Sequence, residues 1–199
     1  MKRVVVEKQK RILDDFFKVE EAWVSYERFD GSMTPVVRRL NFERGDSVAV
    51  LIFNAGTQRI LMVSQFRYPT YAKGPGWITE IVAGMIDGDE APEDAARREV
   101  EEETGFAVSH LEHIATFYVS PGGSSERIGL YYAEVVASDR VGAGGGLAAE
   151  NEDILDVELT VSEAVREVQN GNIVDAKTIM GILWLRNRLA GGATSEGSR

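Results

Sequence analysis

The chain has 199 residues, of which 44% are hydrophobic and 27% are charged, and it contains no cysteine. This composition is typical of a globular protein with a buried core, and the lack of cysteine excludes disulfide and thiol chemistry. The formal net charge of −10 argues against a nucleic-acid partner, because binding a phosphate backbone needs a basic surface. No apolar run approaches about 18 residues and no secretory signal is recognisable, so we expect no membrane partner and a cytoplasmic protein.

The N-terminal part of the chain is predicted to form short strands. Their ranges are 4–8, 20–28 and 35–42. The dipeptide Asp30-Gly31 is a hairpin-turn signal between the last two. We therefore predict a small β appendage over residues 1–45.

The central part of the chain alternates predicted strands with helices. Strands are predicted over residues 47–53, 59–66, 78–83, 112–119, 127–136 and 154–159. A helix is predicted over residues 92–104. A second helix begins at the capping box formed by Thr160 and Glu163 and ends at Gly171, and a third follows the cap Asp175 over residues 176–190. Mixed strands with helices on both sides predict an α+β fold, an α/β/α sandwich with a mixed β-sheet. We assign residues 46–190 to this domain and residues 191–199 to a flexible tail.

The predicted helix 92–104 carries an acidic face. At 100° per residue, Glu99, Glu102 and Glu103 fall within about 100° of arc, whereas Glu101 points the opposite way. Like charges this close repel one another, so the arrangement favours a bound cation. Ligands that are all oxygen favour a hard ion, Mg²⁺ or Mn²⁺. The alternative is an ordinary solvated acidic face.

The acidic helix belongs to a longer pattern, Gly-x5-Glu-x7-Arg-Glu-aliphatic-x-Glu-Glu-x-Gly-apolar. Its fixed positions are Gly84, Glu90, Arg98, Glu99, Val100, Glu102, Glu103, Gly105 and Phe106. This segment resembles the signature of the Nudix hydrolases, and a merely solvated face would leave its flanking residues unexplained. The resemblance covers residues 35–190 and implies the Nudix fold with metal-dependent cleavage of a diphosphate linkage.

The resemblance also implies a metal site. Its ligands would be the Ala83 carbonyl, before the signature glycine, with the carboxylates of Glu99 and Glu103. Glu102 is expected to be a further ligand and to take part in catalysis. We expect Arg98 and Glu90 to support the segment as a charge-assisted pair.

A second acidic cluster lies at residues 150–153, after the glycine-rich stretch 142–146. The glycines predict a mobile loop that closes over a substrate, with an acidic surface turn as an equal alternative on sequence alone. The run is similar to the loop of the ADP-ribose pyrophosphatases that supplies the general base and an extra ligand. This similarity implies Glu150 as the base and Glu152 as the ligand.

Pro121 follows Phe106 by 15 positions, the offset that marks the ADP-ribose branch of the family. The resemblance implies hydrolysis of ADP-ribose to AMP and ribose 5-phosphate, with Glu150 accepting the proton of the attacking water. The alternative substrate is GDP-mannose or another nucleotide sugar. The runs 42–45 and 150–153 slightly favour ADP-ribose over this alternative. An alternative of another class is a non-catalytic, nucleotide-sensing Nudix domain, although the intact signature and the lack of a basic DNA-binding segment disfavour it.

Several residues outside the signature are candidates for substrate binding. Arg67 offers a planar fork for a phosphate, with a surface ion pair as the alternative. In the resembling enzymes, which are homodimers with exchanged N-terminal strands, Arg39 matches a substrate-contacting arginine, and Phe16 or Phe17 lies where an aromatic stacks on the base. Glu126 is a secondary acidic candidate. We therefore expect a strand-swapped homodimer, with a core role as the alternative for the aromatic residues.

Overall fold

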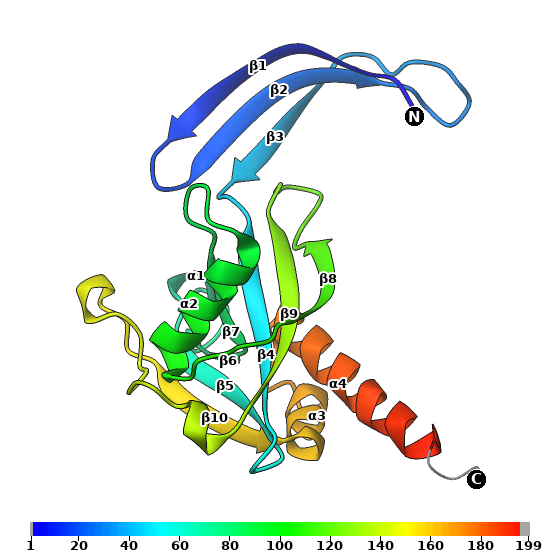
Figure 1. The fold of residues 1–199 in the computed structure, drawn as a ribbon. Coiled ribbons are helices and arrows are strands. Elements are labelled where there is room, and N and C mark those ends of the chain that lie inside the picture. The colour runs from blue at the N-terminus through cyan, green and yellow to red at the C-terminus, as the bar shows by residue number, and fades with distance from the viewer. Residues whose placement is uncertain (1, 196–199) are drawn as a thin grey trace. The chain divides into compact units, whose positions relative to one another are not determined.

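The computed structural model describes the backbone of residues 2–195, and the side chains of this range except those of residues 150 and 192–195. The chain divides into two compact units (Figure 1). The first comprises residues 1–46 and 117–128, and the second comprises residues 47–116 and 129–199. The sequence prediction placed residues 117–128 in the second domain.

The first unit contains a three-stranded antiparallel sheet in the order β1-β2-β3. The strands are β1 (Val4–Asp14), β2 (Lys18–Tyr26) and β3 (Val37–Glu43). The predicted turn at Asp30-Gly31 connects β2 to β3, and Gly31 adopts a φ of 84° there. Strand β1 is longer than the predicted 4–8. All its residues are exposed, so its polar residues cost no burial and do not end the strand.

The second unit is built on a seven-stranded sheet. Five of its strands follow the order β10-β5-β4-β9-β8, while β6 pairs with β5 and β7 pairs with β4. The strands are β4 (Ser47–Asn54), β5 (Arg59–Phe66), β6 (Trp77–Glu80), β7 (Val82–Met85), β8 (Glu112–Tyr118), β9 (Arg127–Val135) and β10 (Leu155–Thr160). The predicted strand 78–83 is thus two short strands. They separate at Ile81, whose backbone N–H donates to the Thr178 hydroxyl (2.9 Å) instead of to a neighbouring strand.

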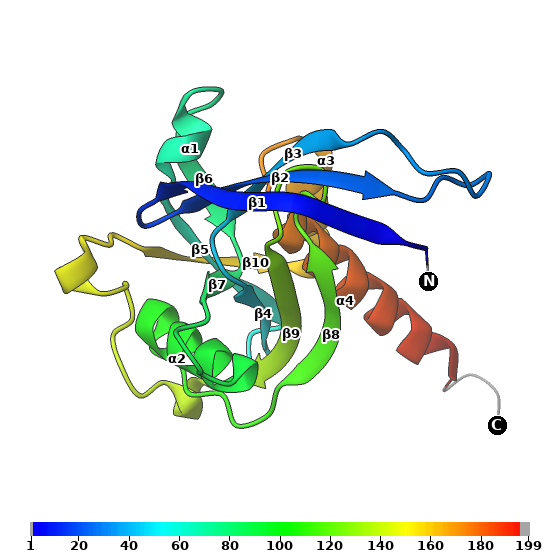
Figure 2. The same cartoon turned by 90° about the horizontal axis from the view of Figure 1, so that it is seen from above.

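Helices cover both faces of this sheet. Strand β4 is buried at all eight positions, which requires a covering layer on each side. Helix α2 (Pro92–Thr104) packs with Val48 and Val50 in one core cluster. On the other face, a Cβ added at Gly181 of α4 (Ala176–Ser195) would lie 3.4 Å from the Leu51 side chain. The strands lie between α2 and α4 (Figure 2), and the predicted α+β fold is confirmed.

The remaining helical elements are short or follow the predicted signals. Helix α3 (Val161–Gln169) begins at the predicted Thr160 capping box. Three short elements were not predicted: α1 (Tyr68–Tyr71) and the 3₁₀ helices η1 (Ala137–Asp139) and η2 (Ala148–Glu150). Helix α4 continues to Ser195 instead of ending at 190, because Gly191 and Gly192 each cost only about 1 kcal/mol in a helix. Within the described part of the chain, every helix is too short or too polar to cross a membrane.

Candidate active site

The acidic helix α2 has the predicted bounds and orientation. It begins at Pro92 and is closed by Gly105, which adopts the left-handed conformation (φ 72°) and donates its N–H to the Glu101 carbonyl (2.9 Å). Glu103 is only 3% exposed, while Glu101 lies on the exposed side. The helix therefore turns carboxylates toward the interior of the second unit, where they are costly unless compensated.

Strand β7 brings the signature glycine against this helix. A Cβ added at Gly84 would lie 1.8 Å from Glu99 Oε1, so no side chain fits between the strand and the Glu99 carboxylate. Ala83, whose carbonyl was predicted to be a ligand, precedes Gly84 in the same strand and pairs with Ala49 of β4. The close approach explains why a glycine stands at this position.

Arg98 links the signature loop to the acidic face. The predicted pair is present, because its Nε and Nη2 donate to the two oxygens of Glu90 (3.2 and 3.0 Å). Arg98 Nη2 also donates to the Met85 carbonyl (3.1 Å). Beyond the prediction, Nη1 donates to Glu99 Oε1 (2.8 Å) and Glu102 Oε2 (3.2 Å). One guanidinium therefore orients two of the predicted metal ligands as well as the loop.

Glu103 is the most perturbed carboxyl of the cluster. Burial raises its pKa to about 8, and the negative charges of Glu99, Glu80 and Glu152 act in the same direction. The positive charge of Arg67 opposes the rise. Glu103 Oε2 is buried and has no hydrogen-bond partner among the described residues. A buried oxygen that lacks a donor, surrounded by further carboxylates, is what a cation-binding site requires.

The donor set of this cluster fits a hard divalent cation. Burial also raises the pKa of Glu99, so this carboxyl too would gain from a nearby positive charge. Among the described side chains, no three acidic or histidine groups are already arranged as a metal centre. Arg98 supplies the hydrogen bonds to Glu99 and Glu102 instead. The available ligand atoms are all oxygen, and the buried Glu103 Oε2 accepts no hydrogen bond from the described residues that an ion would have to displace.

The glycine-rich stretch packs on the C-terminal end of α2. Gly145 and Gly146 donate their N–H groups to the carbonyls of Glu103 (2.7 Å) and Glu102 (3.1 Å). A Cβ added at Gly144, whose φ is 71°, would lie 2.5 Å from the Thr104 carbonyl carbon. These glycines allow a close backbone approach, and the mobility predicted for the stretch stays a prediction.

The acidic loop follows directly. The backbone of Glu150 lies in η2, and its side chain falls outside what the structure describes, so its role as base stays a prediction. Glu152 Oε2 accepts the N–H of Leu147 (2.9 Å). The Glu152 charge also acts on the pKa of Glu99 and Glu103, so its carboxylate belongs to the same electrostatic cluster.

Glu80 is a site residue that the sequence did not reveal. It ends β6, is 4% exposed, and accepts the Arg67 Nε–H (2.8 Å) through Oε1. Its second oxygen accepts from Lys177 Nζ. The alternative for Arg67, an ion pair, is therefore present, but with a buried partner. The available signal was an acidic residue within the apolar run from Ile78 to Val82.

Four predicted substrate residues lie in the first unit, so their part in this site stays a prediction. Arg39 lies in β3, where it is exposed and donates Nη1 to the Arg38 carbonyl (2.9 Å). Phe16 and Phe17 form the turn between β1 and β2, with ring centroids 4.7 Å apart, and Phe16 is 74% exposed. Phe16 is therefore free to contact a ligand.

Glu126 and Phe17 are more enclosed. Glu126 is 8% exposed and pairs with Arg44 (3.6 Å). The Arg44 guanidinium also lies 5.4 Å from the centroid of the Phe17 ring, and the Phe42 ring is 5.1 Å from that ring. These contacts give Glu126 and Phe17 structural partners within the first unit.

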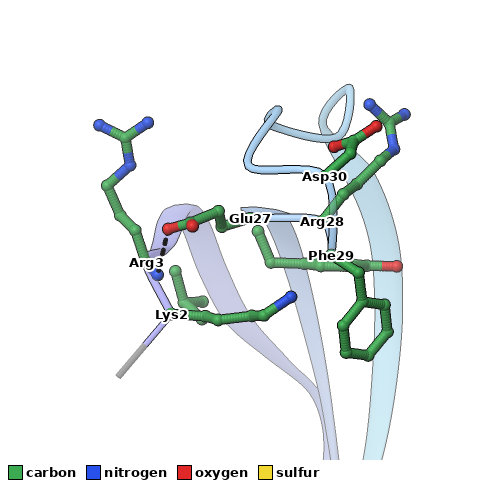
Figure 3. A pocket seen from close by; sticks show the side chains of 8 residues that line it. Lys2, Arg3, Glu27, Arg28, Phe29 and Asp30 are labelled. Carbon is green, nitrogen blue, oxygen red and sulfur yellow. Dashed lines mark hydrogen bonds between the residues drawn. The ribbon is translucent and has the colours of Figure 1, made fainter.

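The first unit also contains a cavity of about 710 Å³ beside the β2–β3 turn (Figure 3). Glu27 accepts the Arg3 backbone N–H (3.2 Å) at its edge, and Lys2 Nζ lies 3.7 Å from the centroid of the exposed Phe29 ring. None of the predicted catalytic or metal-binding residues lines this cavity, so the acidic cluster of the second unit is the candidate active site.

Comparisons with known proteins identify the family of the chain. Residues 43–180 match the family model of the NUDIX domain. The chain is 38% identical over 175 residues to the GDP-mannose pyrophosphatase of Pectobacterium atrosepticum, covering 86% of this chain and 89% of that protein. It is 34% identical over 186 residues to the GDP-mannose pyrophosphatase of Escherichia coli, covering 92% and 95%. A crystal structure of an ADP compounds hydrolase shares the fold, with a TM-score of 0.72 over 96% of each chain at 17% identity.

Proposed function

Because the chain belongs to the Nudix family and is a hydrolase of the nucleotide-sugar pyrophosphatase type, we propose that its substrate is GDP-mannose, cleaved to GMP and mannose 1-phosphate. The two relatives named for that activity support this choice. ADP-ribose is the second candidate, favoured by the runs 42–45 and 150–153. The argument for ADP-ribose is weaker because Glu43 already contacts Ser125 and Arg44 already contacts Glu126.

The observation that carries the proposed metal-dependent hydrolysis is the unpaired buried oxygen of Glu103 in a cluster of carboxylates. Folding places this negative charge where burial and its neighbours oppose ionisation, which is costly for a purely structural position. A site that must hold cations against a diphosphate accounts for that cost.

Nudix hydrolases generally use divalent metal ions, and we propose Mg²⁺ or Mn²⁺ here. The ligands would be the Ala83 carbonyl, Glu99 and Glu103, with Glu102 and Glu152 as further carboxylates. A bound ion would supply neutralisation of the charge that develops on the diphosphate.

The side chains of the chain itself have separable tasks in the proposed reaction. Arg67 binds a phosphate through its terminal nitrogens. Glu150 accepts a proton from the attacking water, and Glu102, held by Arg98, is the second acidic group beside the reacting atoms. The water oxygen forms a bond to one phosphorus while that phosphorus loses its bond to the bridging oxygen. The bridging oxygen leaves with the other phosphate.

We infer further that the protein is a homodimer assembled through the first unit. Strand β1 is exposed along its whole length and includes large apolar residues such as Val4 (62% exposed) and Leu13 (49% exposed). A long exposed edge strand of this kind favours pairing with a second copy. Light scattering coupled to size exclusion would show twice the mass of the chain, and a monomer at micromolar concentration would contradict the inference.

A substrate panel tests the proposed reaction. With Mg²⁺ or Mn²⁺, kcat/KM would be measured for GDP-mannose, ADP-ribose, ADP-glucose, NADH and 8-oxo-dGTP, with the EDTA-treated protein as the control. We expect the highest value for GDP-mannose. Preference for a nucleoside triphosphate would overturn the branch assignment, and a folded protein that cleaves none of these compounds would favour the non-catalytic, nucleotide-sensing alternative.

A further inference from the structure

We propose that Glu80 is a positioning residue that sets the direction in which Arg67 presents its guanidinium to a substrate phosphate. This inference rests on the proposed function, in which Arg67 binds a phosphate. The geometry joins three elements of the second unit: Arg67 follows β5, Glu80 ends β6, and Lys177 lies in the first turn of α4.

The Arg67 side chain is held at one edge only. Its Nε–H donates to Glu80 Oε1 (2.8 Å), whereas its two terminal nitrogens make no hydrogen bond within the described residues. Its backbone is fixed by the Gly76 carbonyl, which accepts the Arg67 N–H (2.7 Å). The Arg67 side chain is 40% exposed and that of Glu80 is 5% exposed, so Glu80 is the buried member of the pair.

Glu80 is itself fixed from the opposite side. Its Oε2 accepts from Lys177 Nζ, and Lys177 also pairs with Asp175 Oδ1 (3.1 Å). The next residue along the strand, Ile81, donates its N–H to Thr178 (2.9 Å), so two consecutive positions are tied to the start of α4. A buried carboxylate with both oxygens paired has little freedom, and it transmits that rigidity to Arg67.

The arrangement also balances charge beside the acidic cluster. The charges of Glu80 and Arg67 both act on the pKa of Glu103, which places the pair within electrostatic range of the proposed metal ligands. Lys177 pairs with the second oxygen of Glu80, which offsets part of its negative charge near the place where a diphosphate must bind. The pair therefore presents a directed positive charge instead of a freely moving one.

A double-mutant cycle tests the inference. Arg67→Ala and Glu80→Gln should each raise the KM for GDP-mannose, and its Kd measured by calorimetry in EDTA, by about tenfold with a smaller change in kcat. The double variant should be no worse than Arg67→Ala alone, because the two residues act as one unit. Glu80→Asp should recover part of the loss, and Glu112→Gln, which removes the carboxylate paired with Arg188, should change neither quantity.

A second readout is independent of turnover. The Arg67 Nε–Hε signal in NMR spectra, assigned by its loss in Arg67→Ala, should be protected in the wild-type protein and lost or shifted in Glu80→Gln. If Glu80→Gln does not fold, Lys177→Met should give the same change more weakly, since it frees one oxygen of Glu80. Additive effects in the cycle, or an unchanged Arg67 signal, would overturn the inference. Absence of turnover in the wild-type protein would instead count against the proposed function.

Discussion

Gly84 and Glu99 approach so closely that the Glu99 carboxylate occupies the space a side chain at position 84 would need. An added Cβ would lie 1.8 Å from Glu99 Oε1 and 1.9 Å from its carboxyl carbon. Gly84→Ala should therefore displace the Glu99 carboxylate and lower kcat/KM by about a hundredfold, the usual effect of misplacing a catalytic group by about 1 Å. Steady-state kinetics on the best substrate of the panel would measure this loss.

The matched control for this variant is Gly191→Ala. A Cβ added there meets nothing within 4 Å, so activity should be unchanged. Both variants should keep a cooperative thermal transition. If Gly84→Ala retained full activity, the Glu99 carboxylate would have no role at its observed position.

The pH dependence of stability should report the burial of Glu103. Burial raises its pKa from 4.5 to about 8, so between these values the folded state holds a proton that the unfolded state has lost. The free energy of unfolding of the metal-free protein should consequently fall as pH rises through this window, by at most about 1.4 kcal/mol per pH unit from this group. Glu103→Gln should remove that contribution and be the more stable form at pH 8.

Urea denaturation in EDTA at several pH values would measure these slopes. Glu101→Gln, which removes an exposed carboxylate of the same helix, should keep the wild-type slope. Added Mg²⁺ should stabilise the wild-type protein near pH 8 and have little effect on Glu103→Gln. Parallel pH profiles for wild type and Glu103→Gln would refute the assignment of a perturbed carboxyl.

Helix α2 could be predicted from sequence because its signals are local. Pro92 and Gly105 mark its ends, and helical geometry alone separates Glu101 from the inward Glu103. Glu80 could not be found in this way. Its contacts are with Arg67, 13 positions away, and with Lys177, 97 positions away, and no local pattern encodes them.

One error in the predicted strands has the same origin. The predicted strand 78–83 divides at Ile81 because the Ile81 N–H donates a hydrogen bond to the Thr178 hydroxyl, which only the packed structure brings near. The contact of the Gly144 backbone with Thr104 of the signature helix could not be predicted either, whereas the mobility suggested by the glycines stays a prediction. A glycine-rich composition indicates only that a segment has few side chains. The tertiary contacts of the segment decide whether it moves or packs closely.

Arg98→Lys should show that the shape of the guanidinium matters as well as its charge. Arg98 donates hydrogen bonds to Glu90, Glu99 and Glu102 at the same time. The ammonium group of a lysine cannot keep this set of directed hydrogen bonds. We expect a loss of about 10–100-fold in kcat/KM, together with a higher Mg²⁺ concentration for half-maximal activity. Arg97→Lys is the control, because Arg97 makes only looser ion pairs with exposed carboxylates (3.6 Å) and one hydrogen bond to the Glu93 carbonyl (3.2 Å). Equal activity of both variants would mean that Arg98 supplies charge alone.

Gly144→Ala should separate the packing of the acidic loop from the chemistry of its carboxylates. The new Cβ would lie 2.5 Å from the Thr104 carbonyl carbon and 2.8 Å from the Glu103 carbonyl oxygen, and a backbone cannot move aside as a flexible side chain does. The positive φ of 71° adds strain. The loop should therefore shift away from α2, with the positions of Glu150 and Glu152.

We expect kcat to fall by about a hundredfold while the Kd for GDP-mannose changes little, because Arg67 is not part of this contact. The comparison is with Glu150→Gln, which should lower kcat to a similar extent without altering the fold. If the two changes were combined, the losses should not add, since a displaced base and a missing base have the same consequence. An additive loss in the double variant would show that Gly144 acts through something other than the loop that carries Glu150.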